Sequence, residues 1–153
     1  MSRYKNEVRS IQVILKGSKW VNDPETKTIL DEYQRIIDAN TVKGREKRAA
    51  LQILFSSRAI DTLLAHIVRN DCVARRQVPQ QYYTLEASLS YLRNVGLLPS
   101  KFLDQRTYDD LCRNVKEPRN KYLHTAGIFP TDIELSKFLW STINGMRVVS
   151  RMK

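Results

Sequence analysis

One short stretch of the chain, from Arg119 to His124, carries side chains that together can cut a phosphodiester bond without a metal. The histidine is one of 2 in the protein, and an imidazole exchanges protons near neutral pH. The arginine can hold a phosphate through two parallel hydrogen bonds. The amide of Asn120, the next residue, can orient either group. The sequence therefore predicts Arg119, Asn120 and His124 as candidate catalytic residues.

The spacing of Arg119 and His124 does not by itself bring their side chains together. Five residues along an ideal helix give a rise of about 7.5 Å and a turn of about 140° away from one face. Pro118 distorts a helix because it lacks the amide hydrogen, and Gly127 places His124 near a helix end. The dipole there favours a charged imidazole. We expect these features to bring the long arginine within reach of the histidine.

The same residues also allow a purely structural interpretation. Arg119 can form an ion pair with an acid such as Glu117 or Asp109, and His124 can cap its helix. An arginine and a histidine five residues apart occur often by chance, so spacing alone favours this interpretation.

The elements that position this stretch are expected to be helices. The chain has 153 residues, 42% of them hydrophobic, with 5 glycines and 5 prolines. This is enough for one hydrophobic core, and no segment shows the alternation of a strand followed by a hairpin turn. We expect one all-α domain over residues 1–153, a bundle of about five helices with an N-terminal helical segment at 1–40.

Apolar residues at helical spacing set the expected helix boundaries. Thr131 and Glu134 form a capping box that begins the last helix, and Asp71 to Gln80 is expected to be a loop. The expected helical segments are a start to about residue 22, Asp23 to Asn40, Arg45 to Asn70, Thr84 to Arg93, a segment from about Leu103 that Pro118 interrupts, and Thr131 onward.

The chain is strongly basic, with 26 lysines and arginines against 16 acids and a formal charge of +10. This excess favours a polyanionic partner, either nucleic acid or an acidic protein, over a merely solvated surface. The basic residues that we predict to contact RNA are Lys116, Lys121, Arg113, Arg75 and Arg76.

Other classes of protein are disfavoured. Cys72 and Cys112 lie far apart without metal-ligand spacing, so free thiols are expected, and we expect no metal and no cofactor. The N-terminus has no apolar signal core, and the uncharged apolar runs are too short to span a bilayer. A cytoplasmic protein without a membrane partner is expected.

The stretch at 119–124, within a helical chain of this length, resembles the HEPN superfamily. The motif of that family is an arginine and a histidine separated by four to six residues, the first of them usually polar. The segment from Phe55 to Leu64 is similar to the central helix of the family, with Arg58 and Asp61 inside an apolar stripe. The resemblance covers roughly residues 45–150.

The resemblance implies a metal-independent endoribonuclease that acts as a symmetric homodimer, as in toxins and antiphage defence proteins. Two copies of Arg119, Asn120 and His124 would form one composite cleft for RNA, with Arg58 and Asp61 in support. Inactive members exist, so the alternative is a non-catalytic basic bundle that binds nucleic acid or a protein partner, as a regulatory subunit or an antitoxin.

Several other residues keep two interpretations. Asp61 either holds Arg119 or Arg58 across the bundle or lies on its rim. Tyr82 and Tyr83 either stack on single-stranded RNA or pack on the bundle. His66 is expected to be a surface or satisfied core residue of the central helix. Trp20 and Trp140 are expected to be core or interface anchors.

Overall fold

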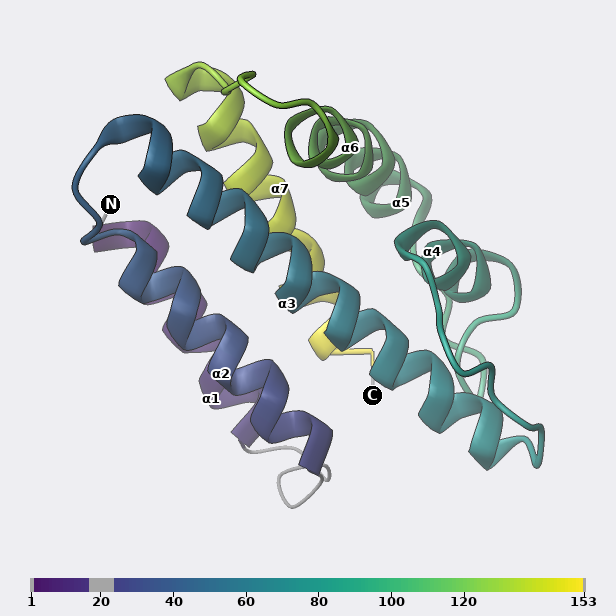
Figure 1. The fold of residues 1–153 in the computed structure, drawn as a ribbon. Coiled ribbons are helices and arrows are strands. Elements are labelled where there is room, and N and C mark those ends of the chain that lie inside the picture. Colours follow the sequence, from purple (N-terminus) through teal and green to yellow (C-terminus); the bar gives the residue numbers. More distant parts are fainter. Residues whose placement is uncertain (1, 17–23, 153) are drawn as a thin grey trace.

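A computed structural model of the chain describes residues 2–16 and 24–152, and these form an all-α bundle without a β-strand. The predicted fold class is confirmed. The helices α5 and α6 and the π-helical turn between them, residues 105–124, follow one another without a break and form one rod (Figure 1). The elements are α1 (Ser2–Lys16), α2 (Pro24–Ala39), α3 (Arg45–Ala74), α4 (Leu85–Asn94), α5 (Gln105–Leu111), the π-helical turn η1 (Cys112–Lys116), α6 (Glu117–His124) and α7 (Asp132–Ser150).

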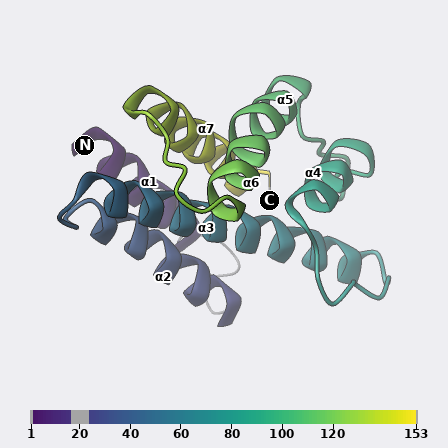
Figure 2. The same cartoon turned by 45° about the horizontal axis from the view of Figure 1, so that its top comes forward.

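Helix α3 is the centre of the bundle. It runs across the whole molecule, with α1 and α2 on one side and α4, α5 and α6 on the other (Figures 1 and 2). Its apolar stripe contacts α2, α4, α6 and α7, and Ile60, Leu63 and Leu64 are fully buried. By length and composition α3 could also cross a membrane, but 67% of its most apolar 18-residue window is buried inside the bundle. The helix is therefore the core of the fold.

Helix α3 continues further than the sequence predicted. We expected it to end near Asn70 and the loop to begin at Asp71, but the helix ends at Ala74. The reason is that Asp71 and Cys72 are buried. The carboxylate of Asp71 accepts hydrogen bonds from Arg75 and Tyr91 side chains, at 2.7 Å each, and from the Leu98 amide. This network keeps the last turn helical and anchors α4 to α3.

The N-terminal segment forms two helices that pack on each other and against α3 and α7. Helix α2 begins at Pro24 and ends at Ala39, close to the predicted bounds. Its buried face holds Ile29, Tyr33, Ile36 and Ile37. Asp23, where this helix was expected to begin, and the predicted anchor Trp20 lie outside the described residues.

The rod that carries the candidate motif is not uniform. Helix α5 begins after Asp104, whose carboxylate accepts from the Thr107 amide at 2.8 Å, and α6 begins at Glu117. Between them η1 has π-helical pairing, with the Glu117 amide donating to the Cys112 carbonyl. Pro118 cannot donate, and its ring crowds the carbonyl four residues earlier. The wider turn thus takes up the strain just before Arg119.

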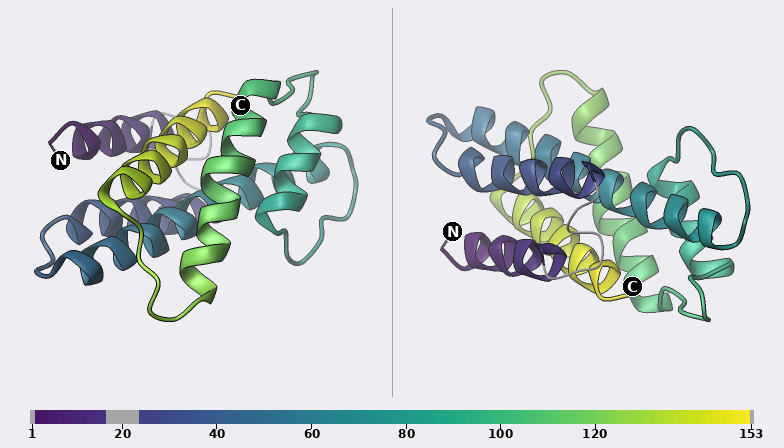
Figure 3. Two further views of the ribbon diagram at one scale, coloured as in Figure 1. Left: turned by 90° about the horizontal axis from the view of Figure 1, so that it is seen from above. Right: turned by 90° about the horizontal axis from the view of Figure 1, so that it is seen from below.

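Helix α7 closes the bundle against α1, α3 and α5 (Figure 3). The predicted capping box is present, since Thr131 accepts from the Glu134 amide and Glu134 accepts from the Thr131 amide. Gly145 lets α7 approach α5, because a methyl group there would overlap the Leu111 side chain. Trp140 is 36% exposed and is therefore not a core residue.

Candidate functional site

Arg119 is held against the central helix by Asp61. Its Nη1 donates to Oδ1 of Asp61 across 2.7 Å, and the two side chains are 18% and 29% exposed. The sequence left open whether Asp61 holds Arg119, holds Arg58 or lies on the rim of the bundle. In the structure it binds Arg119. The acids expected as structural partners of Arg119 are not its partners: Asp109 accepts from Gln105 instead, and Glu117 is exposed.

The carboxyl group of Asp61 is electrostatically unusual. Burial disfavours its charged form, and this raises the pKa of Asp61 to about 6, although the attraction and hydrogen bond of Arg119 oppose the shift. At neutral pH the group is mostly ionised and pairs with Arg119. At mildly acidic pH it takes up a proton, and the ion pair weakens.

Arg58, the other supporting residue that the resemblance implies, lies apart from this pair. Its Nη2 is 2.8 Å from Oε1 of Glu32 on α2, and Glu32 also accepts from Arg35. Glu32 is almost fully buried. Arg58 therefore joins α2 to α3 by pairing with Oε1 of this buried carboxylate.

His124 and Asn120 are exposed on the same helix. As the sequence predicted, His124 lies at a helix end: it is the last residue of α6, and Gly127 follows with a left-handed φ of 76°. Asn120 lies one residue beyond Arg119 and about 100° around the helix. The imidazole and the amide are both open to a ligand.

Within one chain Arg119 and His124 do not converge. Because α6 is regular from Glu117 to His124, the distortion caused by Pro118 lies in η1, before the motif. The two side chains then leave the helix about 140° apart. Arg119 turns inward to Asp61, whereas His124 is exposed. The expectation that Pro118 brings them together is not met.

The predicted RNA-binding cations occupy two regions. Arg113 is exposed, Lys116 lies 3.5 Å from Glu86, and Lys121 lies 3.9 Å from Glu134, all on the rod that carries the motif. Arg75 and Arg76 lie at the far end of α3, about 20 Å from Asp61 by helix rise. Arg75 is bound to Asp71 and to the Gly96 carbonyl.

The two histidines of the protein have different environments. His66 is 2% exposed on α3, and its Nδ1 is paired with a carboxylate oxygen of Glu25. The amide of Asn70 lies 3.2 Å from the other ring nitrogen. His66 is thus a satisfied core residue, which was one of its two predicted interpretations. No local sequence pattern indicated Glu25 as its partner.

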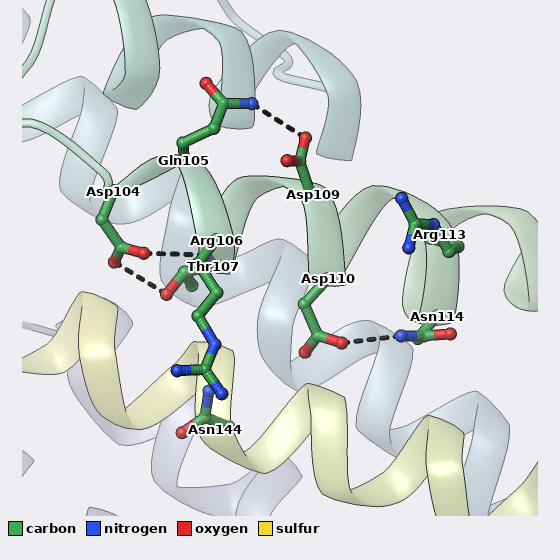
Figure 4. A pocket seen from close by; sticks show the side chains of 9 residues that line it. All are labelled: Asp104, Gln105, Arg106, Thr107, Asp109, Asp110, Arg113, Asn114 and Asn144. Carbon is green, nitrogen blue, oxygen red and sulfur yellow. Dashed lines mark hydrogen bonds between the residues drawn. The ribbon is translucent and has the colours of Figure 1, made fainter.

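The surface is hollowed in several places. One groove, of about 990 Å³, lies between α5, η1 and α7. Its carboxylates are already bound within the groove, Asp104 to Thr107, Asp109 to Gln105 and Asp110 to Asn114 (Figure 4). A second groove, of about 330 Å³, includes Lys121 and Arg113. A small pocket of about 160 Å³ has Asp61 in its wall.

Exposed apolar side chains surround the end of α6. Leu123, Ile128 and Phe129 are 37–40% exposed, and Ile133 on the first turn of α7 is 82% exposed. We call these four residues the α6–α7 corner. Arg45 binds Asp132 and the Pro130 carbonyl, each at 3.0 Å, so the connector is tied to the start of α3.

Comparison with protein-family models, with curated proteins and with solved structures finds no match for this chain. Among residues 2–16 and 24–152, no group of three or more His, Cys, Asp or Glu side chains is arranged to hold a metal ion.

Proposed function

We propose that this protein is a metal-independent endoribonuclease of the HEPN type that acts as a homodimer. The observation that carries the proposal is the arrangement on α6, where Arg119 is fixed by Asp61 and His124 is exposed on the last turn of the same helix. The charge of +10 agrees with an RNA substrate.

A homodimer supplies what one chain lacks. Cleavage by internal transfer needs a base and an acid, and among the described residues His124 is the exposed histidine while His66 is buried. A two-fold axis places the same patch of both chains together. The α6–α7 corner gives that patch apolar side chains next to His124.

The reaction follows from these groups. His124 of one protomer takes the proton from the ribose 2′-hydroxyl, and the oxygen attacks the adjacent phosphorus. The bond from phosphorus to the 5′ oxygen breaks, and the partner's His124 donates a proton to that leaving oxygen. The products are a 2′,3′-cyclic phosphate and a 5′-hydroxyl, so protons and bonds balance.

Arg119 stabilises the charge that develops on the phosphate oxygens. A guanidinium has five N–H donors in a planar fork, and the bond to Asp61 uses one nitrogen, Nη1. Nη2 and Nε remain for a phosphate. Asp61 is thus a positioning residue that fixes the plane of the guanidinium, and exposed Asn120 is placed to bind the phosphate or orient it.

The proposal is tested by incubating the protein with total RNA in excess EDTA. Wild-type protein is expected to cut RNA, and His124→Ala is expected to leave it intact. Val13→Ala, an exposed change on α1 far from the motif in sequence, serves as the matched control. Equal cleavage by wild type and His124→Ala would contradict the proposal.

A second candidate function is a non-catalytic basic bundle that binds nucleic acid or an acidic protein. The observation that favours it is the ion pair itself, because an arginine bound to Asp61 also has a purely structural use. The two functions separate in one assay. A binding module retains RNA or partner affinity but releases no fragments at any protein concentration.

A further inference from the structure

A small pocket adjoins the Arg119–Asp61 pair on the side of the 80–84 segment. Its volume is about 160 Å³, and Asp61, Thr62, Ala65, Arg69, Tyr82 and Tyr83 line it. Asp61 belongs both to the pocket wall and to the ion pair with Arg119. A ligand in this pocket therefore lies one side chain away from the guanidinium that we assign to the phosphate.

The pocket has the size of one ring. A cavity of about 150 Å³ in a protein core is filled by benzene, and a pyrimidine base has a ring of the same size. Neither a paired base nor a folded peptide segment would fit this volume. The size therefore points to a single unpaired base with its sugar and phosphate outside.

The walls of the pocket are held in place. Arg69 donates to Oε1 of Glu25 and to the Gln81 carbonyl, each across 3.2 Å, and its guanidinium lies 6.0 Å from the centre of the Tyr83 ring. Tyr83 is 8% exposed, and its hydroxyl accepts from the Gln80 amide at 3.0 Å. These bonds fix the floor of the pocket before any ligand enters.

Tyr82 differs from its neighbour. Its side chain is 69% exposed, although it lines the pocket. A large aromatic ring open to water at the mouth of a pocket offers a face for a base to stack on, and such stacking tolerates any base. The sequence left stacking and packing open for both tyrosines. The structure has Tyr83 packed in the bundle and Tyr82 exposed.

The polar groups of the pocket match the edge of a pyrimidine. Among the described residues Arg119 is the donor to Asp61 and it uses Oδ1, so Oδ2 can accept an N–H from a base. The Thr62 hydroxyl and an N–H of Arg69 can donate to base carbonyls. Uracil and cytosine both carry an N–H group and a carbonyl on the edge that forms Watson–Crick pairs.

We propose that this pocket binds one unpaired pyrimidine base of single-stranded RNA, stacked on Tyr82, next to the phosphate held by Arg119. The inference deepens the proposed function, since it takes RNA as the substrate and adds the base that is read beside the cut. It gives the protein a preference for pyrimidines that the motif alone does not provide.

The test measures binding of RNAs about eight nucleotides long, labelled with fluorescein, by anisotropy at one fixed salt concentration. The proteins carry His124→Ala, so that the RNA stays intact. Oligouridylate and oligocytidylate are expected to bind more tightly than oligoadenylate. Tyr82→Ala is expected to weaken oligouridylate binding about five- to hundredfold, and Tyr82→Phe is expected to keep it.

Val78→Ala is the matched control, because Val78 lies in the same loop and is 95% exposed. Equal affinities of Tyr82→Ala and Val78→Ala, tighter binding of oligoadenylate, or no binding of any of these RNAs would overturn the inference. Failure of the proposed function looks different. In that case EDTA-resistant cleavage is absent or survives His124→Ala, whereas loss of binding in Tyr82→Ala would still establish the pocket.

Discussion

Arg119 and Asp61 are 58 residues apart in the sequence, and their ion pair of 2.7 Å joins α6 to α3 beside the exposed end of α6. The pair has two consequences. It fixes the guanidinium in one orientation, and it places a carboxyl group with a raised pKa next to the site. Replacing Arg119 changes the first, and titrating Asp61 reports on the second.

Arg119→Ala should abolish cleavage while the fold remains. The pair is partly exposed, so its loss should lower the free energy of unfolding by only about 1 kcal/mol. Arg119→Lys should also be severely impaired, since an ammonium group lacks the planar fork that holds a phosphate through two bonds. Cleavage rates and thermal unfolding followed by circular dichroism check both variants. Arg9→Ala, an exposed arginine of α1, is the control. Unfolding of Arg119→Ala would mean that Arg119 is mainly structural.

Asp61 should make stability depend on pH in a defined window. Its pKa is about 6 in the folded chain and about 3.9 in an unfolded one. The folded state therefore binds more protons between these values. The resulting stabilisation is fully present below about pH 4 and is lost as pH rises through about 6. Relative to Asp61→Asn, wild type should lose roughly 2 kcal/mol between pH 4 and 7. Urea unfolding at a series of pH values measures this difference, and parallel profiles would contradict the assignment.

The two histidines should respond oppositely to replacement by alanine. His124 is exposed, so His124→Ala should change stability by no more than about 0.5 kcal/mol yet remove cleavage. His66 is buried against Glu25, so His66→Ala should cost about 1–3 kcal/mol by leaving polar groups unpaired. Differential scanning calorimetry measures both changes. A large drop in melting temperature for His124→Ala would instead favour a structural cap.

Much of the fold follows from the sequence, because helical spacing and caps are local signals. The capping box at Thr131 and the start of α2 at Pro24 are examples. The end of α3 was predicted too early, since Asp71 looks like a loop residue in isolation. Its partners Tyr91 and Leu98 lie 20 and 27 residues away, and no local pattern reports them.

The candidate site was only partly predictable for the same reason. The motif residues are contiguous and could be found, but the orientation of Arg119 depends on Asp61, 58 residues earlier. Arg69 was missed as a pocket residue. The signal available was its position eight residues after Asp61, which places both on one helix face. That signal gains meaning only once Tyr82 is known to lie beside them.

Exchange between protomers should reveal the composite site. If both histidines of a dimer act, mixing His124→Ala into wild type should lower total activity in proportion to the square of the wild-type fraction. Independent sites would give a linear fall. Phe129→Asp should weaken the dimer, because it places a charge in the apolar α6–α7 corner, and Val78→Asp in a distant loop should not. Sedimentation velocity at micromolar concentration tests the association. A wild-type monomer that still cleaves would contradict the two-histidine mechanism.

The chemistry of the cut should depend on the 2′-hydroxyl of the substrate. RNA should be cleaved in EDTA, whereas DNA and RNA with a 2′-O-methyl group at the cut site should stay intact, because the attacking oxygen is then missing or blocked. The rate should rise and then fall as pH increases, since one imidazole must be neutral and its partner charged. The product ends distinguish this route from hydrolysis by a metal-bound water. The fragment that ends in a cyclic phosphate cannot be ligated through its 3′ end until that phosphate is opened and removed. The other fragment carries a 5′-hydroxyl and must be phosphorylated before its 5′ end can be joined. Products with 3′-hydroxyl and 5′-phosphate ends, or a strict requirement for magnesium, would exclude the transfer mechanism.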